Sequence, residues 1–259
     1  MKKKIVALCL CVALAVVAIG GATLAYFTDT TDAKTNTFTV GNVDIELTEP
    51  SWKEDDTHTL MPGTSYAKNP TITVTQKSQD AYVFLKVDMN KYVSLVNLMG
   101  VDAYKNNIGG LQGTYPGFTT FVRNLAADNT LRAAVIDRWF TGINHADWKV
   151  MNLSEIMAWV EGAADQTNPT KLEIVLGYIG SEDDTLSAGG SVTFMTAFGM
   201  PKTVTASMFD GEDAYRIDEV SKSNFNTDSA KFKMTFTAYA IQKAEIADID
   251  AAYTALFKK

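Results

Sequence analysis

Residues 81–90, AYVFLKVDMN, place apolar side chains on both faces of an extended chain. Such a run is typical of a strand at the centre of a sheet, where both faces are covered. Residues 231–242, KFKMTFTAYAIQ, alternate apolar and polar side chains instead, which predicts a half-buried strand. The two segments predict a β-sheet that draws its strands from both ends of the chain.

Other strands are predicted around this pair. Residues 38–47 alternate in the same way, apart from an interruption at Gly41 and Asn42 that indicates a bulge or a turn. We expect the sheet of the folded domain to start with Val43, Ile45 and Leu47. Three more segments have the composition of strands: 71–76 (TITVTQ), 171–179 (KLEIVLGYI) and 191–200 (SVTFMTAFGM).

The middle of the chain has a different period. From residue 91 to about 168, apolar residues recur at spacings of three and four, which predicts a largely helical insertion. Asn152 or Ser154 is available as a helix cap within it. Residues 244–259 predict a short amphipathic helix at the C-terminus. Its apolar stripe consists of Ile246, Ile249, Tyr253 and Leu256.

These elements predict a mainly β fold. Strands lie early and late around the helical segment without βαβ alternation, which favours an antiparallel, jelly-roll-like β-sandwich with a helical insertion and a short C-terminal helix. No internal repeat or low-complexity linker interrupts the chain. We therefore expect one β-sandwich domain over residues 41–259.

The N-terminus has the pattern of an export signal. Three lysines precede an uninterrupted apolar run over residues 5–19, and small residues follow it. We expect cleavage between Ala25 and Tyr26. A retained membrane anchor is an alternative, although the run is short of the roughly 20 residues of a membrane span. A lipoprotein is a weaker one, because Cys9 and Cys11 follow leucines rather than small residues.

Cleavage would change the composition of the chain. Cys9 and Cys11 leave with the signal, so disulfides are not expected to stabilise the mature chain. Three lysines also leave, which changes the formal charge from −7 to about −10. Such a charge argues against nucleic acid and against anionic membrane surfaces as partners. No second apolar run has membrane length, so we expect no stable membrane insertion after cleavage.

Residues 21–48, GGATLAYFTDTTDAKTNTFTVGNVDIEL, resemble the N-terminus of the TasA/camelysin family of Gram-positive bacteria. Members share a G-G-T-x-A-x-F-x-D cleavage region followed by T-F-x-x-G-x-[LV]-D-[LI]. The second pattern falls on Thr37, Phe38, Gly41, Val43, Asp44 and Ile45. LMPGTSYAKNPTITV (60–74) and TAYAIQ (237–242) are also similar to family segments, whereas the insertion is not.

The resemblance implies a jelly-roll sandwich, processing by an ER-type signal peptidase, and a role as a secreted fibre-forming matrix or surface protein. It further implies that the N-terminal strand of one subunit completes the sheet of the next. Residues 26–40 would be this assembly strand, with Phe27, Phe38 and Val40 buried in the neighbour. In this interpretation, residues 26–40 have no partner within their own chain. The alternative is an ordinary disordered N-terminus.

The sequence offers little support for an enzyme. His58 and His145 are not spaced as in H-E-x-x-H, so zinc would need carboxylates such as Asp55, Asp56 or Asp147. We expect no catalytic residues, no cofactor and no metal site. Camelysin-like relatives are described as surface metalloproteases, however, and such an activity is the alternative to the fibre-forming role.

Two other features have structural interpretations. The acidic clusters SEDDT (181–185) and DGEDAYRIDE (210–219) lack the ligand spacing of a calcium loop, so solvated loops are expected. Trp139, Trp148 and Trp159 are expected to pack in the core or between elements, with a sugar-binding platform as the alternative. A monomeric adhesin that uses the helical insertion is a further alternative. The interpretation that we favour is a secreted homopolymer with other matrix or cell-wall components as further partners.

Overall fold

The computed structural model describes residues 28–31, 43–52, 60–90, 92–162, 172–205, 208 and 232–258. The strands are β1 (Thr28–Thr31), β2 (Ile45–Thr48), β3 (Ser65–Ala67), β4 (Thr71–Val74), β5 (Ala81–Met89), β6 (Phe140–Thr141), β7 (Trp148–Val150), β8 (Leu172–Tyr178), β9 (Ser191–Thr193), β10 (Ala197–Gly199) and β11 (Met234–Gln242). The helices are α2 (Tyr92–Lys105), η1 (Ile108–Gly110), α3 (Phe118–Ala127), α4 (Asn129–Ile136), α5 (Leu153–Gly162) and α8 (Ile249–Phe257). Within this part of the chain, no helix combines the length and the apolar character needed to cross a membrane.

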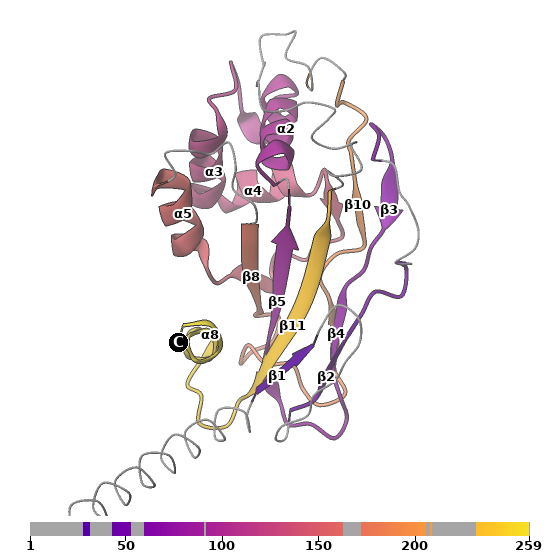
Figure 1. Cartoon of the computed structure of the whole chain (residues 1–259), viewed down its shortest axis with the longest axis vertical. Helices are drawn as coiled ribbons and strands as arrows, with labels where there is room; N and C mark the ends of the chain where they lie inside the picture. The colour runs from indigo at the N-terminus through magenta and orange to yellow at the C-terminus, as the bar shows by residue number, and fades with distance from the viewer. Residues whose placement is uncertain are drawn as a thin grey trace, which may run out of the picture.

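The largest sheet has five antiparallel strands in the order β1-β11-β5-β8-β7 (Figure 1). β5 lies at its centre, as its apolar run predicts. Val83 and Leu85 are buried in the main core on one face, whereas Tyr82 and Phe84 are buried in a second cluster on the other. The prediction of a central strand covered on both faces is therefore confirmed.

Two three-stranded antiparallel sheets, β2-β4-β9 and β3-β10-β6, lie on one side of the large sheet (Figure 1). Ile45 and Ile72 of the first belong to the same hydrophobic cluster as Leu85 and Phe236 of the large sheet. This packing confirms an antiparallel sandwich. The division into sheets of five, three and three strands fits a mainly β fold only loosely and does not establish a jelly roll.

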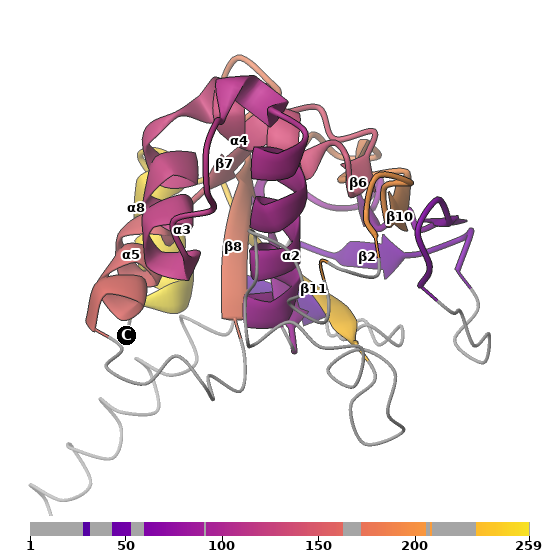
Figure 2. The same ribbon diagram turned by 90° about the horizontal axis from the view of Figure 1, so that it is seen from above.

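The helices α2 to α5 lie between residues 92 and 162, where the helical period predicts them. They gather at the end of the molecule toward which β5 points (Figures 1 and 2). The same segment also contributes β7 to the edge of the large sheet and β6 to the edge of a small one. The insertion is thus part of both layers, which the helical period alone does not indicate.

A buried carboxylate connects α2 to distant parts of the chain. Asp102 is fully buried, and its Oδ2 accepts a hydrogen bond from Arg138 Nε at 2.9 Å. Thr203 Oγ1 and Asn106 Nδ2 donate to its Oδ1 at 2.6 and 2.9 Å. Because a buried charge is costly unless it is paired, these contacts fix the insertion to the segment after β10.

The side chain of Asn152 is not used as the sequence suggests. Rather than capping a helix, its Nδ2 donates to the carbonyl of Glu173 at 2.8 Å, and its Oδ1 accepts from the N–H of Val175 at 2.9 Å. Both partners belong to β8. The amide therefore continues the pairing of β7 with β8 beyond the end of β7.

The C-terminal helix α8 covers the outer face of the large sheet, as the amphipathic stripe predicts (Figure 1). Ile249 and Tyr253 pack on Tyr82 and Phe84 in the second hydrophobic cluster. The side chain of Asp248 caps the helix by accepting from the N–H of Ala251 at 2.8 Å. The C-terminal helix is therefore confirmed.

Candidate functional site

β1 is the part of the expected assembly strand that the structure describes. It pairs antiparallel with β11 at the edge of the large sheet, with Thr28 opposite Ile241 and Thr31 opposite Ala238 (Figure 1). The expectation that residues 26–40 have no partner within their own chain is therefore wrong for residues 28–31. The alternation of a strand predicts that it has neighbours, but it does not identify which strand lies beside it.

The remaining predicted site residues divide into two groups. Val43, Ile45 and Leu47 lie in the main core, and the first two are fully buried. The second group lies outside the described residues. It consists of the two cleavage residues, the aromatic and apolar residues of the assembly strand, and three possible zinc ligands. These are Ala25, Tyr26, Phe27, Phe38, Val40, Asp55, Asp56 and His58.

β11 is held much more firmly than β1. It pairs with β5 at nine positions, from Met234 opposite Met89 to Gln242 opposite Ala81, whereas β1 pairs at four. Phe236, Ala238 and Ala240 of β11 are fully buried in the main core. The edge on which β1 lies is therefore formed by a strand whose position does not depend on β1.

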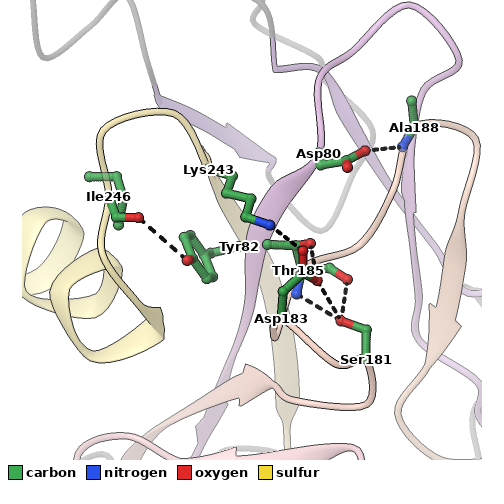
Figure 3. A network of polar contacts seen from close by, with 8 residues as sticks. All are labelled: Asp80, Tyr82, Ser181, Asp183, Thr185, Ala188, Lys243 and Ile246. Atoms are coloured by element: carbon green, nitrogen blue, oxygen red, sulfur yellow. Dashed lines mark hydrogen bonds and ion pairs between the residues drawn. The ribbon is translucent and has the colours of Figure 1, made fainter.

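A polar network holds the C-terminal end of β11 (Figure 3). The N–H of Lys243 donates to the carbonyl of Asp80 at 3.0 Å, and its ammonium group pairs with the carboxylate of Asp183. Thr185 Oγ1 donates to Asp183 at 2.8 Å, and Ser181 Oγ accepts from the N–H of Thr185 at 2.9 Å. The network joins the residue after β11 to the segment before β5 and to the turn after β8.

The same network changes the titration of its charged groups. The hydrogen bond from Lys243, followed by that from Thr185, lowers the pKa of Asp183 to about 2. The hydrogen bond to Asp183 raises the pKa of Lys243 in turn. Asp183 belongs to the acidic cluster 181–185, so this carboxylate is engaged by an internal cation. The second acidic cluster, 210–219, lies outside the described residues.

The other end of β11 is fixed by Asn90. Its N–H donates to the carbonyl of Lys233 at 3.2 Å, and its Oδ1 accepts from the N–H of Lys233 at 2.6 Å. Both ends of β11 are thus tied to residues that flank β5.

A buried cation packs against the core side of β11. Lys68 is 5% exposed, and its Nζ lies 5.2 Å from the ring centroid of Phe236 and 4.3 Å from that of Trp52. Glu49 Oε1 lies 2.7 Å from the same Nζ, as an ion pair without the alignment of a hydrogen bond. Lys68 therefore links the segments that follow β2 and β3 to β11.

The possible metal ligands do not converge in the described part of the chain. His145 Nε2 lies 2.7 Å from Asp137 Oδ1, and both side chains are exposed. No group of three His, Cys, Asp or Glu side chains is placed to hold a metal among the described residues. A catalytic zinc site requires three protein ligands, so the residues that the structure describes do not fit one.

The three tryptophans of the insertion pack as expected. Trp139 and Trp148 are 1% and 8% exposed and belong to the main core. Trp159 is half-buried and lies edge-on to the rings of Tyr92 and Phe118. All three contribute to packing between elements.

Residues 1–101 match the family model described as Camelysin metallo-endopeptidase. The matched segment includes the expected export signal, β1 to β5 and the first part of α2, so the resemblance to the TasA/camelysin family is confirmed there. It supports a camelysin-type protein in a secreted-protein context. No curated protein and no solved structure matches the chain.

The camelysin match contradicts the prediction that the protein is not an enzyme, because the family is described as a metallo-endopeptidase. That prediction depended on the absence of H-E-x-x-H. The absence of this motif excludes one arrangement of zinc ligands and does not exclude enzymes in general. The pairing of β1 with β11 is the feature of this edge that sequence reasoning missed, and no local signal in either segment identifies it.

Proposed function

We propose that this protein is a secreted structural subunit that assembles into extracellular matrix fibres or a surface layer. In this proposal, β1 leaves the edge of β11 in its own chain and pairs with β11 of the next copy. The observation that carries the proposal is the pairing of a four-residue N-terminal strand with the edge of a firmly held nine-residue strand. The camelysin match over residues 1–101 supports the exported, TasA/camelysin-type context.

The exchange needs no new interface. The strand makes the same main-chain contacts with β11 of a neighbour as with its own, which is why swapping an identical element is a low-cost route to assembly. Thirteen residues separate Thr31 from Ile45, and a chain of that length can span up to about 45 Å. If each copy donates in one direction only, the assembly is an open chain rather than a closed dimer.

Residues 26–40 form the proposed assembly strand. Burial of Phe27, Phe38 and Val40 in a neighbour would contribute about 1.5–3 kcal/mol each. Association costs about 4–15 kcal/mol, so these side chains alone leave a junction marginal. The four residues of β1 lose their main-chain hydrogen bonds in one copy and regain them in the next, so these bonds cancel. Main-chain pairing by the rest of residues 26–40, at a net of about 0.5–1.5 kcal/mol per hydrogen bond, must supply the difference.

Truncation tests the proposal. A mature chain that begins at Tyr26 should form fibres visible by electron microscopy, whereas a chain that begins at Gly41 has an acceptor edge but no donor strand. The truncated chain should not assemble alone, and it should shorten fibres when added to the longer one because it terminates their growth. Fibres of the same morphology from the truncated chain would show that the N-terminal strand is only a tail.

Processing is part of the proposal. An ER-type signal peptidase would cleave between Ala25 and Tyr26, since Thr23 and Ala25 place small residues at positions −3 and −1. The mass of the secreted protein tests this, and a retained Met1 or a lipid mass on Cys9 would contradict it. Other matrix or cell-wall components are proposed as further partners.

A camelysin-like metallo-endopeptidase is the second candidate function, and the description of the matched family is the observation that favours it. His145, paired with Asp137, and His58 are the histidines of the mature chain. Proteolysis that is lost on addition of a chelator, and in His58→Ala or His145→Ala, would support this activity. Proteolysis unaffected by both substitutions would exclude these histidines as ligands.

A further inference from the structure

The pairing of β1 with its own β11 has a consequence for the control of assembly. One side of β11 is paired with β5 at all nine of its positions. The other side is paired with β1 from Ala238 to Ile241. A strand edge can form a ladder with only one strand at a time, so a copy in this state cannot accept the strand of a neighbour at the same positions.

We infer that β1 is an autoinhibitory element that closes the acceptor edge of its own chain. The inference rests on the proposed strand exchange and concerns how that exchange is controlled. Dissociation of β1 releases the donor strand and opens the acceptor edge in the same event. A closed copy is inactive in both roles, and an open copy is active in both.

The structure favours opening at β1 rather than at β11. β11 is tied at one end to Asn90, and at the other to Asp80 and to Asp183 through Lys243. Phe236, Ala238 and Ala240 of β11 are buried in the main core, and Ile241 is buried in the second cluster. The acceptor edge therefore stays in place when the four-residue strand leaves it.

This arrangement predicts a unimolecular step in assembly. At low protein concentration the rate should rise with concentration, because open copies must meet. At high concentration the rate should reach a plateau set by the opening of β1. A simple association of permanently open copies would show no plateau.

A reversible covalent lock tests the inference directly in the full mature chain, which contains no cysteine of its own after cleavage. Thr31 and Ala238 lie directly opposite each other, so Thr31→Cys with Ala238→Cys should form an intramolecular disulfide in the monomer. The oxidised protein should not assemble, and a reductant should restore assembly to the rate of the unmodified chain.

The control is a disulfide in a sheet that does not take part in exchange. Thr71 of β4 and Thr193 of β9 are also directly opposite, and their hydroxyl groups are 2.8 Å apart. Thr71→Cys with Thr193→Cys should leave assembly unchanged in both redox states. This control separates locking of β1 from a general effect of oxidation.

Each other outcome overturns the inference in a distinguishable way. If the oxidised double-cysteine protein assembles at the rate of the reduced protein, pairing of β1 with its own β11 does not inhibit assembly. That result would leave the proposed fibre formation intact. Failure of the intramolecular disulfide to form would show that β1 does not occupy its own β11 in the monomer. Absence of assembly in every form, the unmodified chain included, would overturn the proposed function together with the inference.

Discussion

At the scale of single residues, Gly100 shows how closely the insertion is packed. An ideal β-carbon at this position of α2 would lie 2.1 Å from Cε2 of Tyr115. The ring cannot move aside easily, because the Tyr115 hydroxyl donates to the buried Asn97 Oδ1 at 2.8 Å. Gly100→Ala should therefore destabilise the protein by about 1–3 kcal/mol, although alanine is the better helix former by about 1 kcal/mol.

Gly162 is the matched control, because it ends α5 and nothing lies within 4 Å of an ideal β-carbon there. Gly162→Ala should leave the free energy of unfolding unchanged or raise it by up to about 1 kcal/mol. Urea unfolding of both variants checks the pair. Equal changes in the free energy of unfolding for the two variants would show that contact with Tyr115 does not destabilise Gly100→Ala.

The Asp183–Lys243 pair makes a second prediction at this scale. The pKa of Asp183 falls from 3.8 to about 2 in the folded chain. A carboxylate with a lowered folded pKa stabilises the fold above its unfolded pKa, and this stabilisation is lost as the pH falls through the folded value. Asp183→Asn should therefore be less stable than the unmodified protein at pH 5, and the difference should shrink between about pH 4 and pH 2.

Denaturant midpoints measured across this pH range test the prediction. Glu182 is an exposed neighbour in the same turn, so Glu182→Gln serves as the control and should not reproduce the trend. A difference for Asp183→Asn that is constant from pH 5 to pH 2 would mean that the ion pair does not account for it.

At the scale of elements, proline substitutions distinguish the residues of β1 whose N–H groups point toward β11 from those whose N–H groups point away from it. In an edge strand, alternate N–H groups point toward the paired strand and away from it, so proline is tolerated only at every second position. Asp29 and Thr30 are adjacent, and one of them directs its N–H toward β11. Of Asp29→Pro and Thr30→Pro, one should abolish assembly and the other should reduce it much less, as measured by light scattering.

The elements also show what sequence can and cannot predict. Apolar patterning predicts β5, β11 and α8, because these elements bury long faces with a clear period. It does not predict β6 or β7, which contain two and three residues and are defined by their partners. For the same reason it misses the pairing of Thr28–Thr31 with β11, since strand neighbours depend on the whole fold.

At the scale of the whole molecule, the proposed cleavage would change the formal charge from −7 to about −10. Copies with this charge repel one another, and salt screens the repulsion beyond about 8–10 Å at physiological ionic strength. Assembly should therefore be several-fold faster in physiological salt than in low salt at pH 8, and faster at pH 5 than at pH 8. If light scattering shows the same assembly rate at each salt concentration and pH, charge repulsion between copies does not control assembly.

In the proposed assembled state, β1 of one copy pairs with β11 of another. The most direct measurement mixes two single-cysteine proteins, one with Thr31→Cys and the other with Ala238→Cys, and oxidises them after assembly. Strand exchange should give a disulfide between the two different copies on a non-reducing gel, and none when Thr71→Cys replaces Thr31→Cys. Fibres that form from the mixture without this cross-link would contradict strand exchange.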